Sequence, residues 1–139
     1  MSESVATCLP KSVLIVDDHE INRRILGLFL EPLGWNLTMA ANGAQALDSA
    51  RIERFDLILM DMMMPVMNGL EATAALRVSD GPNRHTPVIA VTGMDDNRME
   101  WQAAGVSTFL IKPVDPERLL HAVIEAVSPS EDNGRKISA

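Results

Sequence analysis

The sequence predicts an α/β fold in which a parallel β-sheet is covered by helices on both faces. Five short apolar runs are separated by longer segments that have the spacing of amphipathic helices. The apolar runs are continuous rather than alternating, which is typical of strands buried on both faces. Strands that alternate with helices require right-handed crossovers, and these crossovers produce a parallel sheet between two helical layers.

The first strand is the most clearly marked element. Residues 13–16 read Val-Leu-Ile-Val, a short aliphatic run that ends at Asp17 and Asp18. Its β-branched residues favour an extended backbone, and its length fits a strand better than a helix. Four further strands are predicted at residues 35–40, 57–60, 88–91 and 108–111.

The first and last helices have the strongest amphipathic patterns. Pro32 and Gly34 end the first helix, whereas Asp115 is a suitable N-cap for the last, with Pro116 at its first position. The inward stripe of the first helix is predicted at Ile21, Ile25, Leu28 and Leu33, with Leu26 and Phe29 beside it. That of the last helix is predicted at Leu119, Leu120, Val123, Ile124 and Val127.

The three middle helices are predicted from caps and sparser patterns. Asn42 caps the second helix, and the third opens at Asn68 or Gly69. The fourth lies within residues 95–104 and has the weakest pattern. The predicted inward residues are Ala44, Leu47 and Ala50 in the second helix, Leu70, Ala74 and Leu76 in the third, and Met99 and Ala103 in the fourth.

Composition bounds the domain organisation and excludes several classes of protein. The chain has 139 residues and fits one domain, for which we expect residues 12–127, with flexible segments at 1–11 and 128–139. A single cysteine, Cys8, excludes an intramolecular disulfide scaffold. The net charge of −7 disfavours binding to nucleic acid and to anionic membranes. The chain shows neither a signal-peptide pattern nor an apolar run of membrane-spanning length, so a cytoplasmic location is expected.

Polar residues with complementary chemistry stand at the predicted strand ends. Asp17 and Asp18 end the first strand and Asp61 the third, while Thr92 ends the fourth and Lys112 the fifth. In a doubly wound sheet these ends meet along one edge, where ligands bind. Converging carboxylates repel one another unless a cation is present, and oxygen ligands of this kind suit Mg²⁺. Each residue alone is more often a cap, a turn or a solvated loop, but together they predict a site.

Four motifs at these positions carry a resemblance to a known family. They are VLIVDDHEIN, LILMDMMMPVMNGLEA, PVIAVTG and FLIKPVD, in the order of the first, third, fourth and fifth strands. Over residues 12–127 the chain resembles a response regulator receiver domain of two-component and phosphorelay signalling, and it is similar to the receivers of hybrid histidine kinases. The resemblance implies a flavodoxin-like sheet of order 2-1-3-4-5 with five helices. It also implies a module that accepts phosphate without acting as an enzyme on external substrates.

The resemblance assigns roles to individual residues. Asp61 matches the aspartate that receives a phosphoryl group from a phosphohistidine, and Lys112 matches the lysine that contacts this group. Thr92 matches the switch hydroxyl and Phe109 the switch aromatic. Pro113 implies a cis peptide bond after the lysine. The Mg²⁺ ligands would be Asp17, Asp18, Asp61 and the backbone carbonyl of Met63.

Two methionines depart from what a fast-cycling receiver would need. Met63 and Met94 stand two residues after Asp61 and Thr92, at positions that influence dephosphorylation in this family. Because an apolar side chain cannot orient a hydrolytic water, we expect a long-lived phosphoaspartate.

The expected partners are a histidine kinase, a histidine phosphotransfer protein, or both. A downstream protein would bind the face formed by the helix within 95–104, the strand 108–111 and the last helix; no nucleic acid or membrane partner is expected. The three histidines lie in different predicted elements, which argues against a histidine metal site.

Three alternatives remain beside the phosphoacceptor. An unphosphorylated docking receiver would share the fold, and the chain could also be the excised receiver of a hybrid kinase. A haloacid-dehalogenase-type phosphatase is disfavoured, because Asp61 is followed by methionines and lacks the second acid of a D-x-D pattern. A flavodoxin is disfavoured because Asp17 and Asp18 would repel a phosphate after the first strand.

Overall fold

A five-stranded parallel sheet forms the centre of the molecule. The computed structural model describes residues 11–64, 66–93 and 98–128. The strand order β2-β1-β3-β4-β5 confirms the order that the resemblance implies. The strands are β1 (Ser12–Val16), β2 (Asn36–Ala40), β3 (Leu57–Asp61), β4 (Val88–Thr92) and β5 (Thr108–Ile111).

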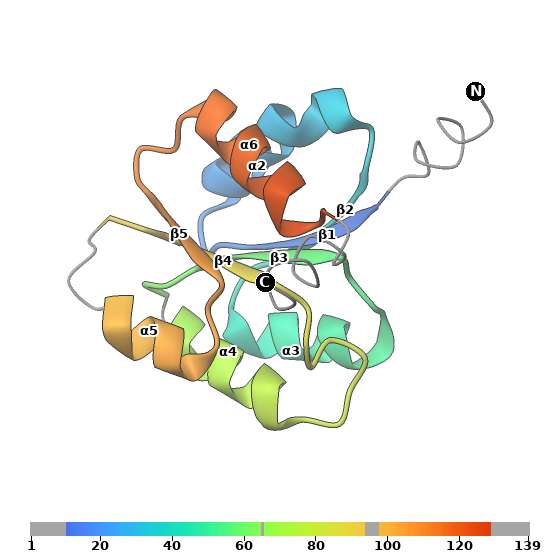
Figure 1. Ribbon diagram of the computed structural model, residues 1–139, viewed down its shortest axis with the longest axis vertical. Helices are drawn as coiled ribbons and strands as arrows, with labels where there is room; N and C mark the ends of the chain where they lie inside the picture. Colours follow the sequence, from blue (N-terminus) through green and yellow to red (C-terminus); the bar gives the residue numbers. More distant parts are fainter. Residues whose placement is uncertain (1–10, 65, 94–97, 129–139) are drawn as a thin grey trace, which may run out of the picture.

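Helices cover both faces of this sheet, as Figure 1 shows. Helices α2 and α6 lie on one face, whereas α3, α4 and α5 lie on the other. Each face has its own apolar core: Leu26, Leu30 and Leu119 belong to the first, and Phe55, Leu76 and Trp101 to the second. The bounds are α2 (Glu20–Leu30), α3 (Gly43–Ile52), α4 (Gly69–Val78), α5 (Arg98–Ala104) and α6 (Pro116–Ala126), with a short 3₁₀ turn, η1 (Glu31–Leu33), after α2.

The predicted helix caps are present. The side chain of Asn42 accepts a hydrogen bond from the backbone N–H of Gln45 at 2.8 Å, which caps α3. Asn68 and Glu71 form a reciprocal capping box at the start of α4. Asp115 accepts from the N–H of Arg118 at 3.0 Å, and Pro116 occupies the first turn of α6. These caps fix where three helices begin relative to the strand ends.

Part of the predicted inward stripe of the first helix is wrong, although Leu26 is buried and Phe29 and Leu33 pack against the core as predicted. Ile21, Ile25 and Leu28 are 69%, 40% and 64% exposed, whereas Leu26 and Leu30 are buried against the sheet. Because apolar residues occupy more than one face of α2, the sequence pattern did not fix which face turns inward. The consequence is an exposed apolar stripe on α2.

Inward assignments in three other helices are also wrong. Ala74 is exposed, and its neighbours Ala72 and Thr73 are buried instead. Ile124 is 48% exposed on α6, where Leu119 and Val123 form the buried stripe. In the helix predicted within 95–104, Met99 and Ala103 face outward and Trp101 is the buried residue. In the described residues that helix spans Arg98–Ala104.

The flexible segments predicted at 1–11 and 128–139 lie outside the described residues, apart from Lys11 and Ser128.

Candidate functional site

The carboxyl ends of β1, β3 and β5 bring two aspartates and a lysine together. Lys112 Nζ lies 3.5 Å from Asp61 Oδ1 and 4.0 Å from Asp17 Oδ2. Both aspartates are almost fully buried, at 1% and 2% exposure, whereas a third of the lysine side chain remains exposed. The sheet register explains the convergence, because β3 lies between β1 and β4 and β5 follows β4. One ammonium group therefore stands beside two buried carboxylates.

The environment of Asp61 makes its carboxylate difficult to ionise. Burial raises the pKa of Asp61 above its usual value, and repulsion from Asp17 adds to this. A hydrogen bond from the backbone N–H of Met63, 3.1 Å from Oδ1, and the charge of Lys112 act in the opposite direction. The net direction is upward, which is the expected result when two acids share one lysine in a buried site.

Backbone contacts hold Asp17 at the end of β1. Its N–H donates to the carbonyl of Ala40 at 3.1 Å, and its carbonyl accepts from the guanidinium of Arg23 at 2.6 Å. The carboxylate accepts from the backbone N–H of His19 at 2.9 Å. These bonds shape the turn from β1 into α2, so that Asp18 and His19 follow at the same edge of the sheet.

The fourth strand presents Thr92 at the same end of the sheet. Thr92 is fully buried, and its carbonyl accepts a hydrogen bond from the backbone N–H of Lys112 at 2.7 Å. The Lys112–Pro113 peptide bond is cis, as the resemblance implies. These contacts join the ends of β4 and β5 beside Asp61.

The predicted switch aromatic packs against α5. Phe109 pairs with Ala90 in the sheet register and is partly buried. Its ring stacks on Trp101 with centroids 5.7 Å apart and planes inclined by 27°. The guanidinium carbon of Arg98 lies 5.2 Å from the Phe109 centroid. The aromatic therefore contacts two side chains of one helix.

Of the two methionines with predicted effects on dephosphorylation, the structure describes only Met63. The side chain of Met63 is 59% exposed, although its backbone N–H bonds to Asp61. Met94 lies outside the described residues. Val66, in the loop after Asp61, has a φ of +71°, a backbone conformation that β-branched residues rarely adopt.

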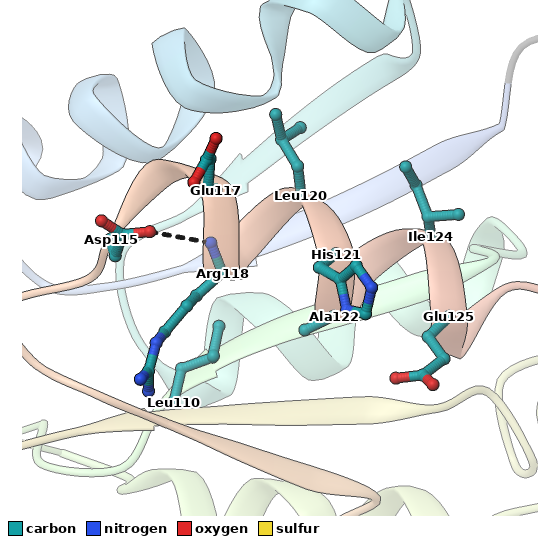
Figure 2. A pocket seen from close by; sticks show the side chains of 9 residues that line it. All are labelled: Leu110, Asp115, Glu117, Arg118, Leu120, His121, Ala122, Ile124 and Glu125. Carbon is teal, nitrogen blue, oxygen red and sulfur yellow. Dashed lines mark hydrogen bonds between the residues drawn. The ribbon is translucent and has the colours of Figure 1, made fainter.

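A small cavity of about 280 Å³ adjoins Asp17 and Lys112. Asp17 and Lys112 line one side of it, and Ile25, Phe29 and Pro113 form apolar walls. A larger, shallow groove of about 830 Å³ lies elsewhere, along α6 beside Leu110 of β5. Figure 2 shows Arg118, His121 and Glu125 along that groove. None of the buried aspartates lines it. Asp17 and Lys112 line the smaller cavity and neither lines the groove, so the smaller cavity is the one beside the acid cluster.

Two features of the site were missed by sequence reasoning. His19 joins Asp17 and Asp18 in a group whose possible ligand atoms all lie within 4.8 Å of one another. His19 directly follows the two aspartates in the sequence, and this adjacency could have predicted the group. It was missed because the three histidines were considered together. The stack of Arg98, Phe109 and Trp101 was also missed, because the weak pattern of that helix did not reveal its inward face.

The fold and this arrangement of acids, hydroxyl and lysine define a phosphoacceptor signalling module. The family model for the response regulator receiver domain matches residues 13–124. The chain belongs to this family, which functions in two-component signalling and is not a class of conventional enzymes.

Relatives of two architectures share the domain. The chain is 39% identical over 119 residues to the polar-differentiation response regulator DivK of Brucella anthropi, covering 83% of this chain and 94% of that protein. It is 36% identical over 124 residues to hybrid signal transduction histidine kinase I of Dictyostelium discoideum, covering 84% of this chain but 7% of the kinase. The domain therefore resembles both a small regulator and a short part of large kinases.

Solved structures give the same fold. The receiver domain of a Pseudomonas aeruginosa sensor histidine kinase, with a magnesium ion coordinated in its active site cleft, has a TM-score of 0.79 and 31% identity, covering 87% of this chain and all of that one. The Vibrio cholerae chemotaxis protein CheY4 also has a TM-score of 0.79, with 33% identity, covering 85% and 99% of the two chains. Among the residues described in our structure, no helix combines the length and apolar character that a membrane span needs.

Proposed function

We propose that this chain is a phosphoacceptor response regulator that receives a phosphoryl group from a phosphohistidine onto Asp61. The observation that carries the proposal is the placement of Lys112 Nζ between the buried carboxylates of Asp61 and Asp17. A carboxylate at this position can attack phosphorus, and the lysine can neutralise charge on the transferred group.

The transfer needs positioning more than covalent chemistry from the protein. An Asp61 carboxylate oxygen would form a bond to phosphorus as the bond between phosphorus and the donor imidazole nitrogen breaks, and a donor protonated on its other ring nitrogen would leave as neutral histidine, with an acyl phosphate on Asp61. The bond from the N–H of Met63 to Oδ1 restricts the orientation of the carboxylate. Lys112 and the hydroxyl of Thr92 would contact the transferred oxygens from the ends of β5 and β4.

The residues present fit a divalent cation. Asp18 Oδ1 is buried and accepts no hydrogen bond from the described residues, so a cation is the partner that this oxygen lacks. We propose Mg²⁺, held by the carboxylates of Asp17, Asp18 and Asp61 and by the carbonyl of Met63. When bound, Mg²⁺ would neutralise the charge that these acids and the phosphoryl oxygens bring together.

We propose that Thr92 and Phe109 convert phosphorylation into a change of surface. A phosphoryl group on Asp61 can accept a hydrogen bond from the hydroxyl of Thr92 and draw it toward β3. Movement of that side chain would leave room into which Phe109 can turn, away from its stack on Trp101. The surface formed by α5, β5 and α6 would then change.

We propose that this α5–β5–α6 surface binds a downstream protein, while a histidine kinase or phosphotransfer protein supplies the phosphate. The shallow groove in Figure 2, lined by Leu110, Arg118, His121 and Ile124, gives the surface both apolar and charged contacts. Residues 12–127 are the proposed extent of the receiver. A cytoplasmic location remains part of this proposal.

The competing function is an unphosphorylated docking receiver. The presence of Asp17, Asp61, Thr92 and Lys112 at the site favours a phosphorylated receiver over a docking receiver. A docking module has no need of buried acids beside a lysine. A receiver excised from a hybrid kinase would have the same chemistry but would pass phosphate within a larger chain.

The test is intact mass spectrometry after incubation with acetyl phosphate, with and without Mg²⁺. The wild-type protein is expected to gain one phosphoryl group only with Mg²⁺, and Asp61→Asn is expected to gain none. Asp56→Asn serves as a matched control, since Asp56 lies before β3 rather than at its carboxyl end. Failure to gain phosphate both from acetyl phosphate and from a phosphorylated histidine donor would overturn the proposal in favour of the docking receiver.

A further inference from the structure

His19 lies beside the proposed ion site but has no role in the function described above. Its Nδ1 is 3.1 Å from Asp18 Oδ1 and 3.7 Å from Asp17 Oδ1. These three side chains form a group that could hold a metal ion. His19 is also the N-cap residue of α2, yet its side chain makes no capping hydrogen bond. The imidazole is therefore not needed to begin the helix.

The relation between His19 and Asp18 differs from an ordinary hydrogen bond. Asp18 Oδ1 is buried and, among the described residues, accepts no hydrogen bond, although an imidazole nitrogen lies 3.1 Å away. The contact therefore lacks the geometry of a hydrogen bond. A buried carboxylate oxygen without a donor is unfavourable, unless a cation is the partner for which it is placed.

The separation of the two atoms matches that of neighbouring ligands on one ion. Ligands about 2.1 Å from an octahedral ion and at right angles to each other are about 3.0 Å apart. The 3.1 Å between His19 Nδ1 and Asp18 Oδ1 is close to this value. The imidazole is 69% exposed, so it can adjust its orientation without disturbing the core.

We propose that His19 supplies a nitrogen ligand to the divalent ion held by Asp18. The inference rests on the proposed function in placing a divalent ion at this end of the sheet. Carboxylate and carbonyl oxygens suit Mg²⁺, whereas imidazole suits borderline ions such as Co²⁺ and Zn²⁺. The imidazole therefore makes the site bind these transition ions more tightly than an all-oxygen site would, with little change in its affinity for Mg²⁺.

The experiment compares Co²⁺ and Mg²⁺ binding by isothermal titration calorimetry in wild type, His19→Gln and His121→Gln. His121 is the matched control, because it is an exposed histidine on α6 and outside the acidic group. We expect His19→Gln to weaken Co²⁺ binding by about tenfold or more, and to change Mg²⁺ affinity by less than about twofold. His121→Gln should leave both affinities unchanged, and Asp18→Asn should weaken both.

Imidazole ¹⁵N resonances give a second, independent readout. Adding Zn²⁺ should shift the ligating nitrogen of His19 strongly while His121 stays unshifted. Equal Co²⁺ affinity in wild type and His19→Gln, or an unshifted His19 nitrogen at saturating Zn²⁺, would overturn the inference and leave an ordinary surface pair. Phosphorylation in Mg²⁺ is measured separately by mass spectrometry. If the protein gains no phosphoryl group but His19 still contributes to Co²⁺ binding, only the proposed function is overturned.

Discussion

At the proposed phosphoacceptor site, burial and reactivity place opposite requirements on Asp61. The fold buries its carboxylate near a second acid, and these two effects raise its pKa despite the nearby lysine. The folded protein therefore holds a proton on Asp61 more readily than the unfolded chain does. Reactivity toward phosphorus requires the ionised form, so the site keeps a charge that the fold disfavours.

The first prediction concerns stability and pH. Asp61 contributes stability when protonated: this contribution is complete below the usual value of 3.8 and is lost as pH rises through the raised folded pKa. Asp61→Asn should therefore increase the free energy of unfolding at pH 7, by on the order of 1 kcal/mol without divalent ions. Urea denaturation in EDTA between pH 3.5 and 8 checks this. The gain should shrink on acidification.

The control is Asp48→Asn, since Asp48 is an exposed aspartate on α3 with a side chain 72% accessible. It should change stability little at any pH. A gain for Asp61→Asn that grows as the pH falls would contradict the assigned direction of the pKa shift.

Val66 provides a second prediction at the residue scale. Its φ of +71° is unfavourable for a β-branched residue, and its side chain is 83% exposed and contributes little packing. Val66→Asn should therefore stabilise the protein by about 1 kcal/mol, because asparagine tolerates this conformation. Thermal unfolding measures the gain. Val78→Asn, an equally exposed valine within α4, is the matched substitution and should give none; equal effects would exclude strain as the cause.

At the scale of elements, strands were easier to predict than helix faces. A strand such as β4 is buried on both sides, so a continuous apolar run predicts it whichever way each residue points. A helix must be assigned a phase, and α2 has apolar residues around much of its circumference. Ile25 and Leu26 are adjacent in sequence, yet the first is exposed and the second buried. Only packing against β1 and α6 selects the face.

The stack between β5 and α5 gives a prediction at this scale. Phe109 lies against Trp101, so a turn of Phe109 toward Thr92 would remove the ring beside the indole. Trp35→Phe leaves Trp101 as the one tryptophan of the chain. In this variant, phosphorylation should change the tryptophan fluorescence emission. The same experiment in Thr92→Ala should show phosphate gain by mass spectrometry without the change in emission. Unaltered emission in a fully phosphorylated Trp35→Phe protein would contradict the proposed coupling.

At the scale of the whole molecule, topology assembles the site from residues distant in sequence. Asp17, Asp61 and Lys112 could be predicted to meet because parallel strands end at one edge, and each is the residue at or just after its strand. The pose of His19 could not, since it depends on the turn formed by hydrogen bonds to Asp17. Patterns repeated along the chain fix the fold, whereas individual side-chain orientations depend on contacts that the pattern does not encode.

The lifetime of the proposed phosphoaspartate would determine how long the phosphorylated state of the whole molecule lasts. The side chain of Met63 is exposed beside Asp61 and offers no group to orient an attacking water. Met63→Asn should therefore accelerate loss of phosphate in Mg²⁺ buffer by about tenfold or more, because an amide can position that water. The decay is followed by mass spectrometry after removal of acetyl phosphate. Met99→Asn, at an exposed methionine of α5, should leave the rate unchanged. Rapid decay in the wild type, unaltered by Met63→Asn, would show that the hydrolytic water is positioned without this side chain and would contradict a long-lived phosphoaspartate.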